Sequence, residues 1–314
     1  MTRILTWEEI EAALGGVDLV AEMERAFQAY TEGRAVVPPV GELLLEEPRG
    51  EVHIKYGYVR EEPGYVVKIA SGFPANAELG RSPNDGLMIL FDRTTGEPEV
   101  ILLDGCRLTD LRTAAAGAVA ARHLAPPVVT CIGLLGTGIQ ARLQMEHLRS
   151  VIPCREILAW GRDTERLAAC LRDLRELGFD ARAAGSPGEV GESCELVVTT
   201  TASEQPLLES VRPGAHVTAI GSDTPTKQEL SAELVARMDV MVVDSRAQAS
   251  LRGEVARAAA QGRVRLEDAL ELGEVIGGQP GRTSAGQLTL ADLTGVAVQD
   301  LAIARAVSGA PPQA

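Results

Sequence analysis

A glycine-rich turn in the middle of the chain is the clearest candidate for ligand chemistry. Gly136-Thr137-Gly138-Ile139-Gln140-Ala141 has the spacing G-x-G-x-x-A and joins an apolar run, 128–134, to a helix-like segment, 139–151. In a strand–turn–helix unit the first glycine makes the turn, the second lets backbone approach a pyrophosphate, and the small third residue packs helix on strand. The free N–H groups and the dipole of the helix N-terminus favour phosphate. The spacing predicts a dinucleotide site, although such turns also join strands to helices for purely geometric reasons.

Two cations stand where they are costly unless an anion accompanies them. Lys68 lies in the apolar run 66–70, where a buried ammonium is expensive and its pKa is easily lowered. The alternative is that Lys68 lies on the wet face of an alternating strand. Arg112 falls in the first turn of a helix expected to begin at Thr109, facing the positive end of the dipole. It either shares an anion such as a carboxylate with the helix N-terminus, or pairs with Asp110.

Asp223 is the candidate acid or base. It follows the expected strand 216–221, so it stands at the carboxyl end of a parallel strand, where open α/β sheets bind ligands. The next residues are Thr224-Pro225, and an aspartate before proline is also common turn chemistry. Thr226 and Glu229 form a possible capping box for a following helix. Catalysis and turn formation both stay open for Asp223.

The end of the expected strand 156–161 carries both charge signs at the position that selects the dinucleotide. An acidic residue there binds the ribose hydroxyls, whereas an arginine suits a 2′-phosphate. Arg162 comes first and can reach a phosphate, while Asp163 before Thr164 is typical of a helix cap. We therefore expect NADP(H) to be preferred, with NAD(H) possible.

Around these residues the chain predicts an α+β segment followed by an α/β segment. Residues 5–33 are expected to be helical, with a capping box from Thr6 to Glu9 and with Val20, Met23, Ala26 and Phe27 on one face. From Pro38 the period changes to two, which predicts an antiparallel sheet from the strands 51–59, 64–70, 86–92 and 98–103. The Ala-rich helix 109–125 then ends at Pro126-Pro127.

Beyond that proline pair, strands and helices alternate, which is typical of a parallel, doubly wound sheet. The expected elements are 128–134, 139–151, 156–161, 164–177, 195–200, 216–221, 227–237 and 239–243. A last helix, 290–307, is expected to return to the first domain, and the tail 308–314 is expected to be loose. The predicted fold is a Rossmann-type domain, 126–286, plus a discontinuous α+β substrate-binding and dimerisation domain formed by 1–125 and 287–314.

Composition narrows the class of protein. The 314 residues are 45% apolar but only 3% aromatic, so the core must be built from Ala, Leu and Val. A formal net charge of −14 opposes a broad phosphate-neutralising surface, so we expect no nucleic-acid partner. Residues 1–9 become polar too early for a signal peptide, and no apolar run reaches membrane-spanning length, which predicts a cytoplasmic protein without a membrane partner. The five cysteines contain no C-x-x-C pair and the four histidines no ligand spacing, so we expect reduced structural thiols and no metal.

Several segments together resemble the ornithine cyclodeaminase/μ-crystallin/archaeal alanine dehydrogenase family. They occur in the family's order and span 38–230. The matching residues are Lys68 with Gly72-Phe73-Pro74 and Asn76, the strand 86–92, Leu111-Arg112-Thr113-Ala114-Ala115, the glycine turn 136–141, and Gly221-Ser222-Asp223-Thr224-Pro225-Thr226-Lys227-Gln228-Glu229-Leu230.

The resemblance implies a homodimer whose first domain supplies the dimer sheet and the substrate pocket, with nicotinamide between the domains. It implies that Lys68 and Arg112 hold a substrate carboxylate, near Asn76, and that Asp223 performs proton transfer at the amine or imine carbon. It places the cofactor against the glycine turn and against Thr113, Thr200, Thr201, Ser222 and Lys227. These roles suit hydride addition to a 2-imino acid whose nitrogen is protonated. Lys68, as a catalytic residue, and Arg112 would clamp and polarise the substrate, and Asp223 would act as acid or base.

One departure from the family bears on the substrate. Ornithine cyclodeaminases carry a glutamate that binds the distal amine of ornithine, and counting back from Lys68 places Lys55 at that position. A lysine there repels a second ammonium and welcomes a second carboxylate. The family's arginine after Pro38-Pro39 is missing, so the alternative is that Lys55 replaces the contact of that arginine. Arg81 is another cation near the same loop. The pattern disfavours ornithine and is closest to the ectoine-utilisation and iminosuccinate-reductase branches.

Three functions follow from these features. The first is an NAD(P)H-dependent reductase of a small 2-imino acid, or an amino-acid dehydrogenase in reverse, with an acidic or simple 2-oxo/imino substrate such as iminosuccinate. The second is a redox-neutral, ornithine cyclodeaminase-type ammonia lyase that uses bound NAD. The third is a μ-crystallin-like protein that binds NADPH without catalysis. The joint retention of Lys68, Arg112 and Asp223 favours catalysis, and Lys55 argues against the cyclodeaminase.

Overall fold

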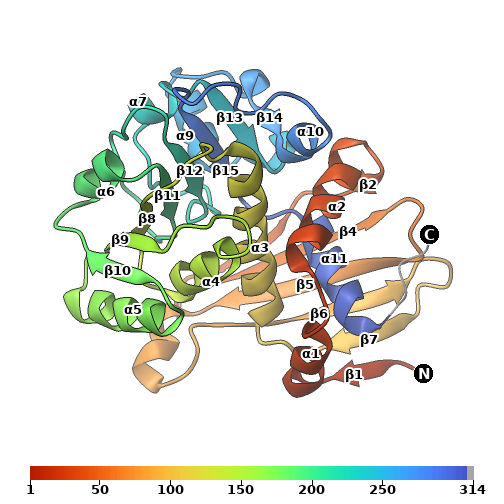
Figure 1. Ribbon diagram of the computed structural model, residues 1–314. Helices are drawn as coiled ribbons and strands as arrows, with labels where there is room; N and C mark the ends of the chain where they lie inside the picture. The colour runs from red at the N-terminus through yellow and green to blue at the C-terminus, as the bar shows by residue number, and fades with distance from the viewer. Residues whose placement is uncertain (310–314) are drawn as a thin grey trace. The chain divides into compact units, whose positions relative to one another are not determined.

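The computed structural model describes residues 1–309, and these residues divide into two units (Figure 1). Unit 1 comprises residues 1–112 and the segment from Val296 onward, and unit 2 comprises Thr113–Gly295. The predicted division lay at 125/126 and 286/287, so these limits differ at both junctions. Long helix α3 (Arg107–Leu124) begins in unit 1 and continues in unit 2, and so the first limit falls inside a helix rather than at the proline pair.

Unit 1 is a mixed sheet with helices on one face. Its strand order is β1-β7-β6-β5-β4-β2, with β3 also paired to β4. Helix α11 packs on β4, β5 and β6 and against α2 (Figure 1). The elements are β1 (Arg3–Leu5), α1 (Trp7–Leu14), α2 (Leu19–Thr31), β2 (Ala35–Val36), β3 (Gly41–Leu45), β4 (Gly50–Val59), β5 (Gly64–Gly72), the 3-10 helix η1 (Pro74–Leu79), β6 (Asn84–Asp92), β7 (Pro98–Leu102) and α11 (Ala297–Ser308).

The predicted antiparallel strands and the first capping box are confirmed in unit 1. The main-chain N–H of Thr6 donates to Glu9 Oε2 at 2.8 Å, and the α2 stripe Val20, Met23, Ala26 and Phe27 is buried. The helical expectation for 5–33 is confirmed for 7–14 and 19–31, but residues 3–5 form a strand beside β7 and residues 15–18 separate α1 from α2. A second helix, α2, begins after Asp18. This residue is the N-cap, and its side chain accepts a hydrogen bond from the Ala21 N–H at 3.1 Å.

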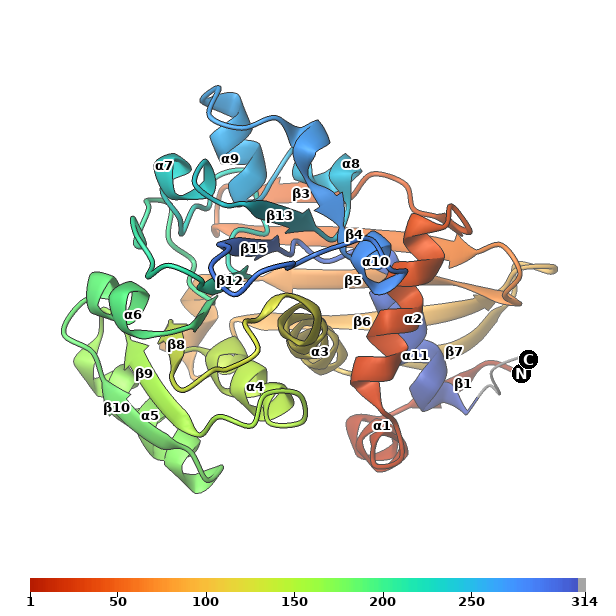
Figure 2. The same cartoon turned by 45° about the horizontal axis from the view of Figure 1, so that its top comes forward.

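Unit 2 is an eight-stranded parallel sheet in the order β10-β9-β8-β11-β12-β15-β13-β14 (Figure 2). The predicted Rossmann-type, doubly wound α/β fold is therefore confirmed, with the order reversing between β8 and β11. The elements are β8 (Ile132–Leu135), α4 (Ile139–Leu148), β9 (Glu156–Trp160), α5 (Thr164–Glu176), β10 (Asp180–Ala183), α6 (Pro187–Ser193), β11 (Leu196–Thr199), β12 (His216–Ala219), α7 (Ala232–Val235), β13 (Val240–Val243), α8 (Arg246–Ala249), α9 (Glu254–Ala260), the 3-10 helix η2 (Leu266–Asp268), β14 (Leu270–Glu271), α10 (Leu272–Ile276) and β15 (Thr289–Asp292).

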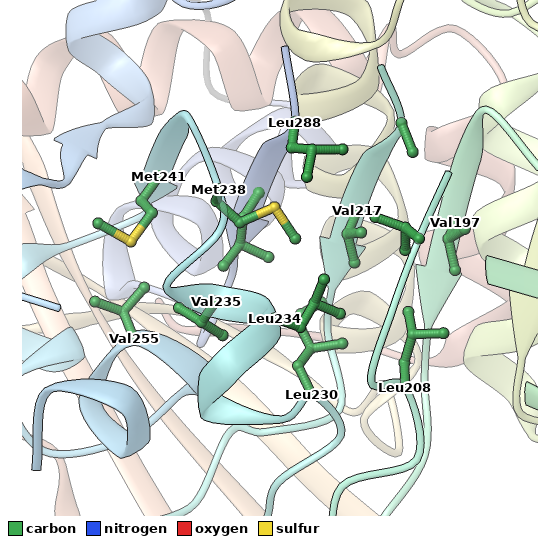
Figure 3. Packing of buried hydrophobic residues seen from close by; sticks show 14 of the residues in the cluster. Val197, Leu208, Val217, Leu230, Leu234, Val235, Met238, Met241, Val255 and Leu288 are labelled. Atoms are coloured by element: carbon green, nitrogen blue, oxygen red, sulfur yellow. The ribbon is translucent and has the colours of Figure 1, made fainter. Parts of the chain in front are cut away.

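Aliphatic side chains fill the core of unit 2, as the shortage of aromatic residues predicts. Figure 3 shows Val197 and Val217 of adjacent strands packed with Leu208, Leu230 and Leu234. Burial of these β-branched and leucine side chains holds the sheet against its covering segments. All five cysteines are free thiols. Over residues 1–309, no helix combines the length and the hydropathy needed to cross a bilayer.

In the second half one expected helix is wrong over most of its range, and another is confirmed only in its later part. The segment 227–237 is not one helix: α7 begins only at Ala232, with Ser231 as its N-cap, because the Glu229 side chain is used elsewhere. The expected last helix, 290–307, is confirmed for 297–307, which form α11 and belong to unit 1. Its first residues instead belong to strand β15, which lies between β12 and β13, and Gly295 (φ 84°) separates β15 from α11. Of the predicted loose tail, 310–314 lie outside the described residues, and Ser308 ends α11.

Candidate active site

The glycine turn leaves the carboxyl end of β8, where the strand order reverses. Gly136 has a φ of 123°, and a Cβ atom there would lie 2.4 Å from Thr200 Oγ1, so this position requires glycine. Gly138 is the N-cap of α4, and a Cβ atom there would meet nothing within 4 Å. Ala141 is buried at the start of the helix. The turn thus leaves open space in front of a helix N-terminus, which fits the approach of a pyrophosphate.

Most of the other predicted cofactor residues follow neighbouring strands at the same edge of the sheet. Thr200 and Thr201 follow β11, and the Thr200 N–H donates to the Leu135 carbonyl at 2.8 Å. Arg162 and Asp163 follow β9. Because all these strands are parallel, their carboxyl ends lie along one edge, beside the glycine turn. The fold therefore gathers residues that are up to 65 positions apart in the chain.

Ser222 and Thr113 differ from the other predicted cofactor residues, because Ser222 is buried and Thr113 lies in a helix. Ser222 follows β12 but is buried, and its hydroxyl donates to Glu254. Thr113 lies in α3, where its carbonyl accepts a hydrogen bond from Gln144 Nε2 at 3.1 Å. The hydroxyl of Ser222 thus already serves the protein's own loop.

Asp163 is a helix cap, as its sequence context predicts. Its Oδ1 accepts hydrogen bonds from the N–H groups of Arg166 (3.0 Å) and Glu165 (2.9 Å), and these bonds lower the pKa of the carboxyl below its ordinary value. The Arg162 side chain is exposed and forms no ion pair within residues 1–309. One oxygen of the acid is therefore committed to α5, while the neighbouring cation extends into solvent.

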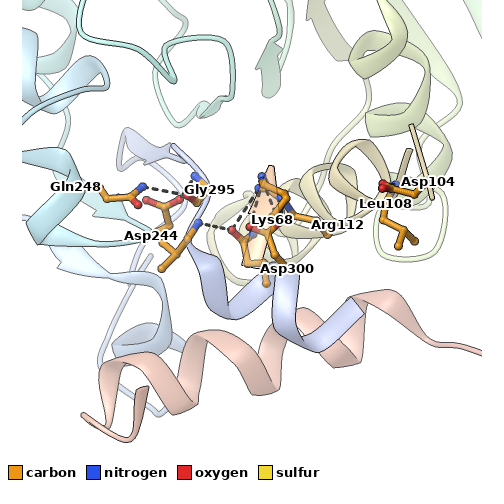
Figure 4. A network of polar contacts seen from close by, with 10 residues as sticks. Lys68, Asp104, Leu108, Arg112, Asp244, Gln248, Gly295 and Asp300 are labelled. Atoms are coloured by element: carbon orange, nitrogen blue, oxygen red, sulfur yellow. Dashed lines mark hydrogen bonds and ion pairs between the residues drawn. The ribbon is translucent and has the colours of Figure 1, made fainter. Parts of the chain in front are cut away.

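A buried carboxylate joins the two predicted substrate cations in unit 1 (Figure 4). Lys68 Nζ lies 3.1 Å from Asp300 Oδ1, and Arg112 Nε donates to the same oxygen at 3.0 Å. The three side chains are at most 5% exposed. Burial by itself raises the pKa of Asp300, but Lys68, Arg112 and Lys55 outweigh it and hold that pKa below its ordinary value. Burial lowers the pKa of Lys68, and Asp300 partly offsets this effect.

This geometry corrects two of the alternatives. Lys68 does not lie on a wet strand face, because it points from β5 toward α11, which covers that face of the sheet. The ion pair of Arg112 is with Asp300, and not with Asp110 as one interpretation had it. Arg112 also lies beyond the first turn of its helix, since α3 begins at Arg107.

Lys55 is the third cation of this face. It stands directly opposite Lys68 in the β4–β5 register and is buried. Asn76 and Arg81 lie instead in the loop between β5 and β6, where the Arg81 N–H donates to the Asn76 carbonyl at 2.9 Å. The Asn76 side chain donates to the Ser82 carbonyl, so within the described residues neither contacts the buried cations. The structure brings Lys55, Lys68 and Arg112 together and leaves Asn76 and Arg81 in the loop.

Asp223 lies in the loop after β12, at the carboxyl edge of the unit 2 sheet. Its Oδ1 accepts a hydrogen bond from Lys227 Nζ at 2.7 Å, and its carbonyl accepts one from Arg252 at 3.2 Å. The carboxylate is 45% exposed. Lys227, predicted to touch the cofactor, therefore holds the orientation of the candidate acid.

Sequence reasoning did not anticipate that Asp300 and Glu229 are buried. Asp300 interrupts an apolar helical stripe that includes Ala297, Leu301 and Ala304, and a lone charge on such a stripe signals a buried partner. Glu229 was assigned to a capping box, but it is fully buried, and burial raises its pKa to about 7. No local pattern distinguished that glutamate from a cap.

Asp104, near Lys68, is a buried acid whose titration should make the free energy of unfolding depend on pH. Its Oδ2 accepts a hydrogen bond from the Leu108 N–H at 3.0 Å, and burial raises its pKa from 3.8 to about 6. The folded state therefore holds this proton more tightly than the unfolded state, so the free energy of unfolding falls as the pH rises from about 4 to 6. The loss is about 3 kcal/mol. Asp104→Asn keeps an acceptor for Leu108 without the charge, and urea unfolding at pH 4 and pH 7 should show a flatter profile. Identical pH profiles would contradict the assignment.

Comparison with known proteins covers both units. A model of the ornithine cyclodeaminase/mu-crystallin family matches residues 1–310. A putative dehydrogenase of Rhizobium meliloti (strain 1021) is 41% identical over 304 residues, which are 94% of this chain and 92% of that protein. The solved archaeal alanine dehydrogenase dimer with bound NAD has a TM-score of 0.90 at 33% identity, covering 98% of this chain and 94% of that one. The iminosuccinate reductase of Paracoccus denitrificans in complex with NAD+ has a TM-score of 0.89 at 31% identity, covering 98% and 95%.

The match extends over the mixed sheet with its buried cations as well as over the parallel sheet with the glycine turn. The chain belongs to the ornithine cyclodeaminase/mu-crystallin family.

Proposed function

We propose that the protein is an NAD(P)H-dependent oxidoreductase that reduces a small 2-imino acid, or oxidises the corresponding amino acid in reverse. The observation that carries the proposal is the pair of buried cations, Lys68 and Arg112, which share the single carboxylate of Asp300. Two cations on one anion favour a further anionic group, and a substrate carboxylate supplies it. The named relatives, an alanine dehydrogenase and an iminosuccinate reductase, support the same class of reaction.

In this mechanism Lys68 and Arg112 bind and orient the substrate carboxylate, and Asp300 holds both cations in place. Asp223 transfers a proton at the reacting amine or imine group, while Lys227 fixes the direction of its carboxylate. The residues 136–140 and Thr200 and Thr201 would hold the dinucleotide, whose nicotinamide supplies the hydride.

The cofactor is a nicotinamide dinucleotide, and we propose a preference for NADP(H). The exposed Arg162 has no ion-pair partner within the described chain, and Asp163 is engaged as the cap of α5. A guanidinium beside the ribose favours a 2′-phosphate. Both known structures described above contain NAD, so the two cofactors must be compared directly.

The cytoplasmic location of the protein stays a prediction.

We further propose that the substrate carries a second carboxylate, and Lys55 provides the test. Lys55 is buried opposite Lys68 and contributes to the low pKa of Asp300. Lys55→Gln should raise KM for the imine formed from oxaloacetate and ammonia by about tenfold or more, because a charge-assisted hydrogen bond is lost. The KM for the imine from pyruvate, which lacks the second carboxylate, should change much less. Lys55→Arg should retain part of the preference, and equal losses on both substrates would contradict the role.

A homodimer is proposed from an apolar sheet face in unit 1. Ile54 and Tyr56 of β4 point away from the face that α11 covers, and they are 36% and 38% exposed. Their register partners, Ile69 and Val67, are only half-buried. An uncovered apolar sheet of this kind fits a second copy of the chain. The similar archaeal alanine dehydrogenase is a dimer, which supports the proposal.

Tyr56→Asp should convert this dimer to a monomer in light scattering, because it places a charge in the apolar face. The matched control is Val128→Asp, which replaces an exposed apolar residue of unit 2 and should leave the mass unchanged. A wild-type protein that is monomeric would refute the proposed dimer.

Turnover with defined substrates tests the function. NADPH or NADH is mixed with ammonium and oxaloacetate, pyruvate or glyoxylate, or with a cyclic imino acid, and the absorbance of the reduced cofactor is followed. We expect oxidation, fastest with oxaloacetate. Cofactor binding without oxidation of any of these mixtures would indicate a binding protein. Proline and ammonia formed from ornithine without net cofactor change would indicate the cyclodeaminase.

A further inference from the structure

A buried glutamate ties together two loops of unit 2 that carry proposed active-site residues. Glu229 Oε1 accepts a hydrogen bond from the Thr201 N–H at 2.5 Å. Its Oε2 accepts bonds from Thr199 Oγ1 at 2.6 Å and from the Gly221 N–H at 2.8 Å. Thr199 is the last residue of β11 and Thr201 follows it, whereas Gly221 follows β12. One carboxylate therefore bridges the carboxyl ends of two adjacent strands, β11 and β12.

The segments that follow β11 and β12 are in close contact, so their spacing can change little. A Cβ atom at Gly221 would lie 2.1 Å from the Thr201 carbonyl oxygen and 2.6 Å from Glu229 Oε2. Gly221 thus packs directly on Thr201 and on the carboxylate. The spacing of the two loops depends on this close approach and on the three hydrogen bonds.

A second buried acid supports the first from α9. Glu254 accepts hydrogen bonds from the main-chain N–H groups of Glu229 (2.7 Å) and Leu230 (3.0 Å), and from the Ser222 hydroxyl. Both glutamates are inaccessible to solvent. The segment 221–230 is therefore held at Gly221, Ser222, Glu229 and Leu230, while Asp223 between them stays half exposed.

We propose that Glu229 is a positioning residue that sets the spacing between the 199–201 and 221–223 segments, and thereby aligns Asp223 with the nicotinamide held by Thr200 and Thr201. The inference rests on the proposed function for its catalytic consequence. Glu229 itself is fully buried, so it acts through these loops and does not contact substrate. Its two oxygens face two N–H donors and one hydroxyl, and a carboxylate can accept from all three.

Glu229→Gln tests this arrangement, because the amide must turn its NH₂ group toward either Thr201 N–H or Gly221 N–H. We expect hydrogen exchange in the cofactor-free protein to accelerate by about tenfold at the amide of Thr201 or of Gly221, whichever faces the NH₂ group. We expect kcat to fall by at least as much, with a smaller change in KM for the imino acid. Thr199→Val removes one donor only and should shift the same amides in the same direction, which guards against misfolding of the first variant.

Glu195→Gln is the matched control at the opposite edge of the sheet. Glu195 Oε2 accepts hydrogen bonds from the N–H groups of Thr130 and Cys131, both at 3.0 Å, so it also joins two strand ends. Its substitution should loosen those amides and leave kcat unchanged. Unchanged exchange at Thr201 and Gly221 in Glu229→Gln would overturn the bridge, and faster exchange with an unchanged kcat would overturn the positioning role. Because exchange is measured without cofactor, a failure of the proposed reductase activity is distinguishable from a failure of this inference.

Discussion

Asp223→Asn is expected to lower kcat by 10²–10⁴-fold, the usual contribution of a positioned acid or base. The amide keeps an oxygen for Lys227 Nζ, which now lies 2.7 Å from Asp223 Oδ1, so the loop should retain its shape. It has no carboxyl proton to transfer, so the proton at the reacting nitrogen must come from water or return to it. Steady-state kinetics with the best imino acid measures the loss, and fluorescence titration should show that NADPH binding is nearly intact.

Thr226→Ala is the matched control in the same loop, since Thr226 is exposed and lies three residues from Asp223. It should retain activity within about threefold, because exposed substitutions away from a site have small effects. Asp223→Asn with activity close to that of Thr226→Ala would remove Asp223 from the mechanism.

Asp300→Asn is expected to lower the free energy of unfolding by about 3–5 kcal/mol, because removal of one partner leaves buried charges uncompensated. Asp300 lies within 3.1 Å of Lys68 Nζ and accepts a hydrogen bond from Arg112 Nε, and all three side chains are nearly inaccessible to solvent. Urea unfolding with a constant m value measures the change. A loss below 1 kcal/mol would show that solvent or another group compensates the two cations.

Two further variants distinguish the loss of the Asp300 ion pairs from unspecific destabilisation of the fold. Asp110→Asn removes the acid that is nearest to Arg112 in sequence but is only half-buried, and it should cost far less. Adding Lys68→Met to Asp300→Asn should recover part of the lost stability, because one uncompensated cation is replaced by an apolar side chain of similar length. If the double variant is less stable than the sum of the single losses, Lys68 is not destabilised by the loss of Asp300.

Local sequence determined the parts of this protein whose signal is contained in a few consecutive residues. The glycine turn, the cap at Asp163 and the alternation of β4, β5, β6 and β7 were predictable, because each depends on backbone geometry or on a period of two. The charged residues at strand ends were predictable for the same reason, since every parallel strand delivers its following residue to one edge. The resemblance to a family added roles to Lys68, Arg112 and Asp223 that local patterns left open.

Only the tertiary structure decided how buried charges are compensated and how distant strands pair. Asp300 reaches Lys68 and Arg112 across 232 and 188 positions, and Glu229 reaches Thr199 across 30. The short apolar run of β15 is compatible with a helix or a strand until β12 and β13 provide hydrogen-bond partners on both sides. Desolvation makes a buried charge without a partner costly, so each buried charge needs a hydrogen-bonding or ion-pair partner. The sequence does not show which residue that partner is. The pairing of Asp300 and Glu229 therefore became visible only when the folded chain placed their donors within hydrogen-bonding distance.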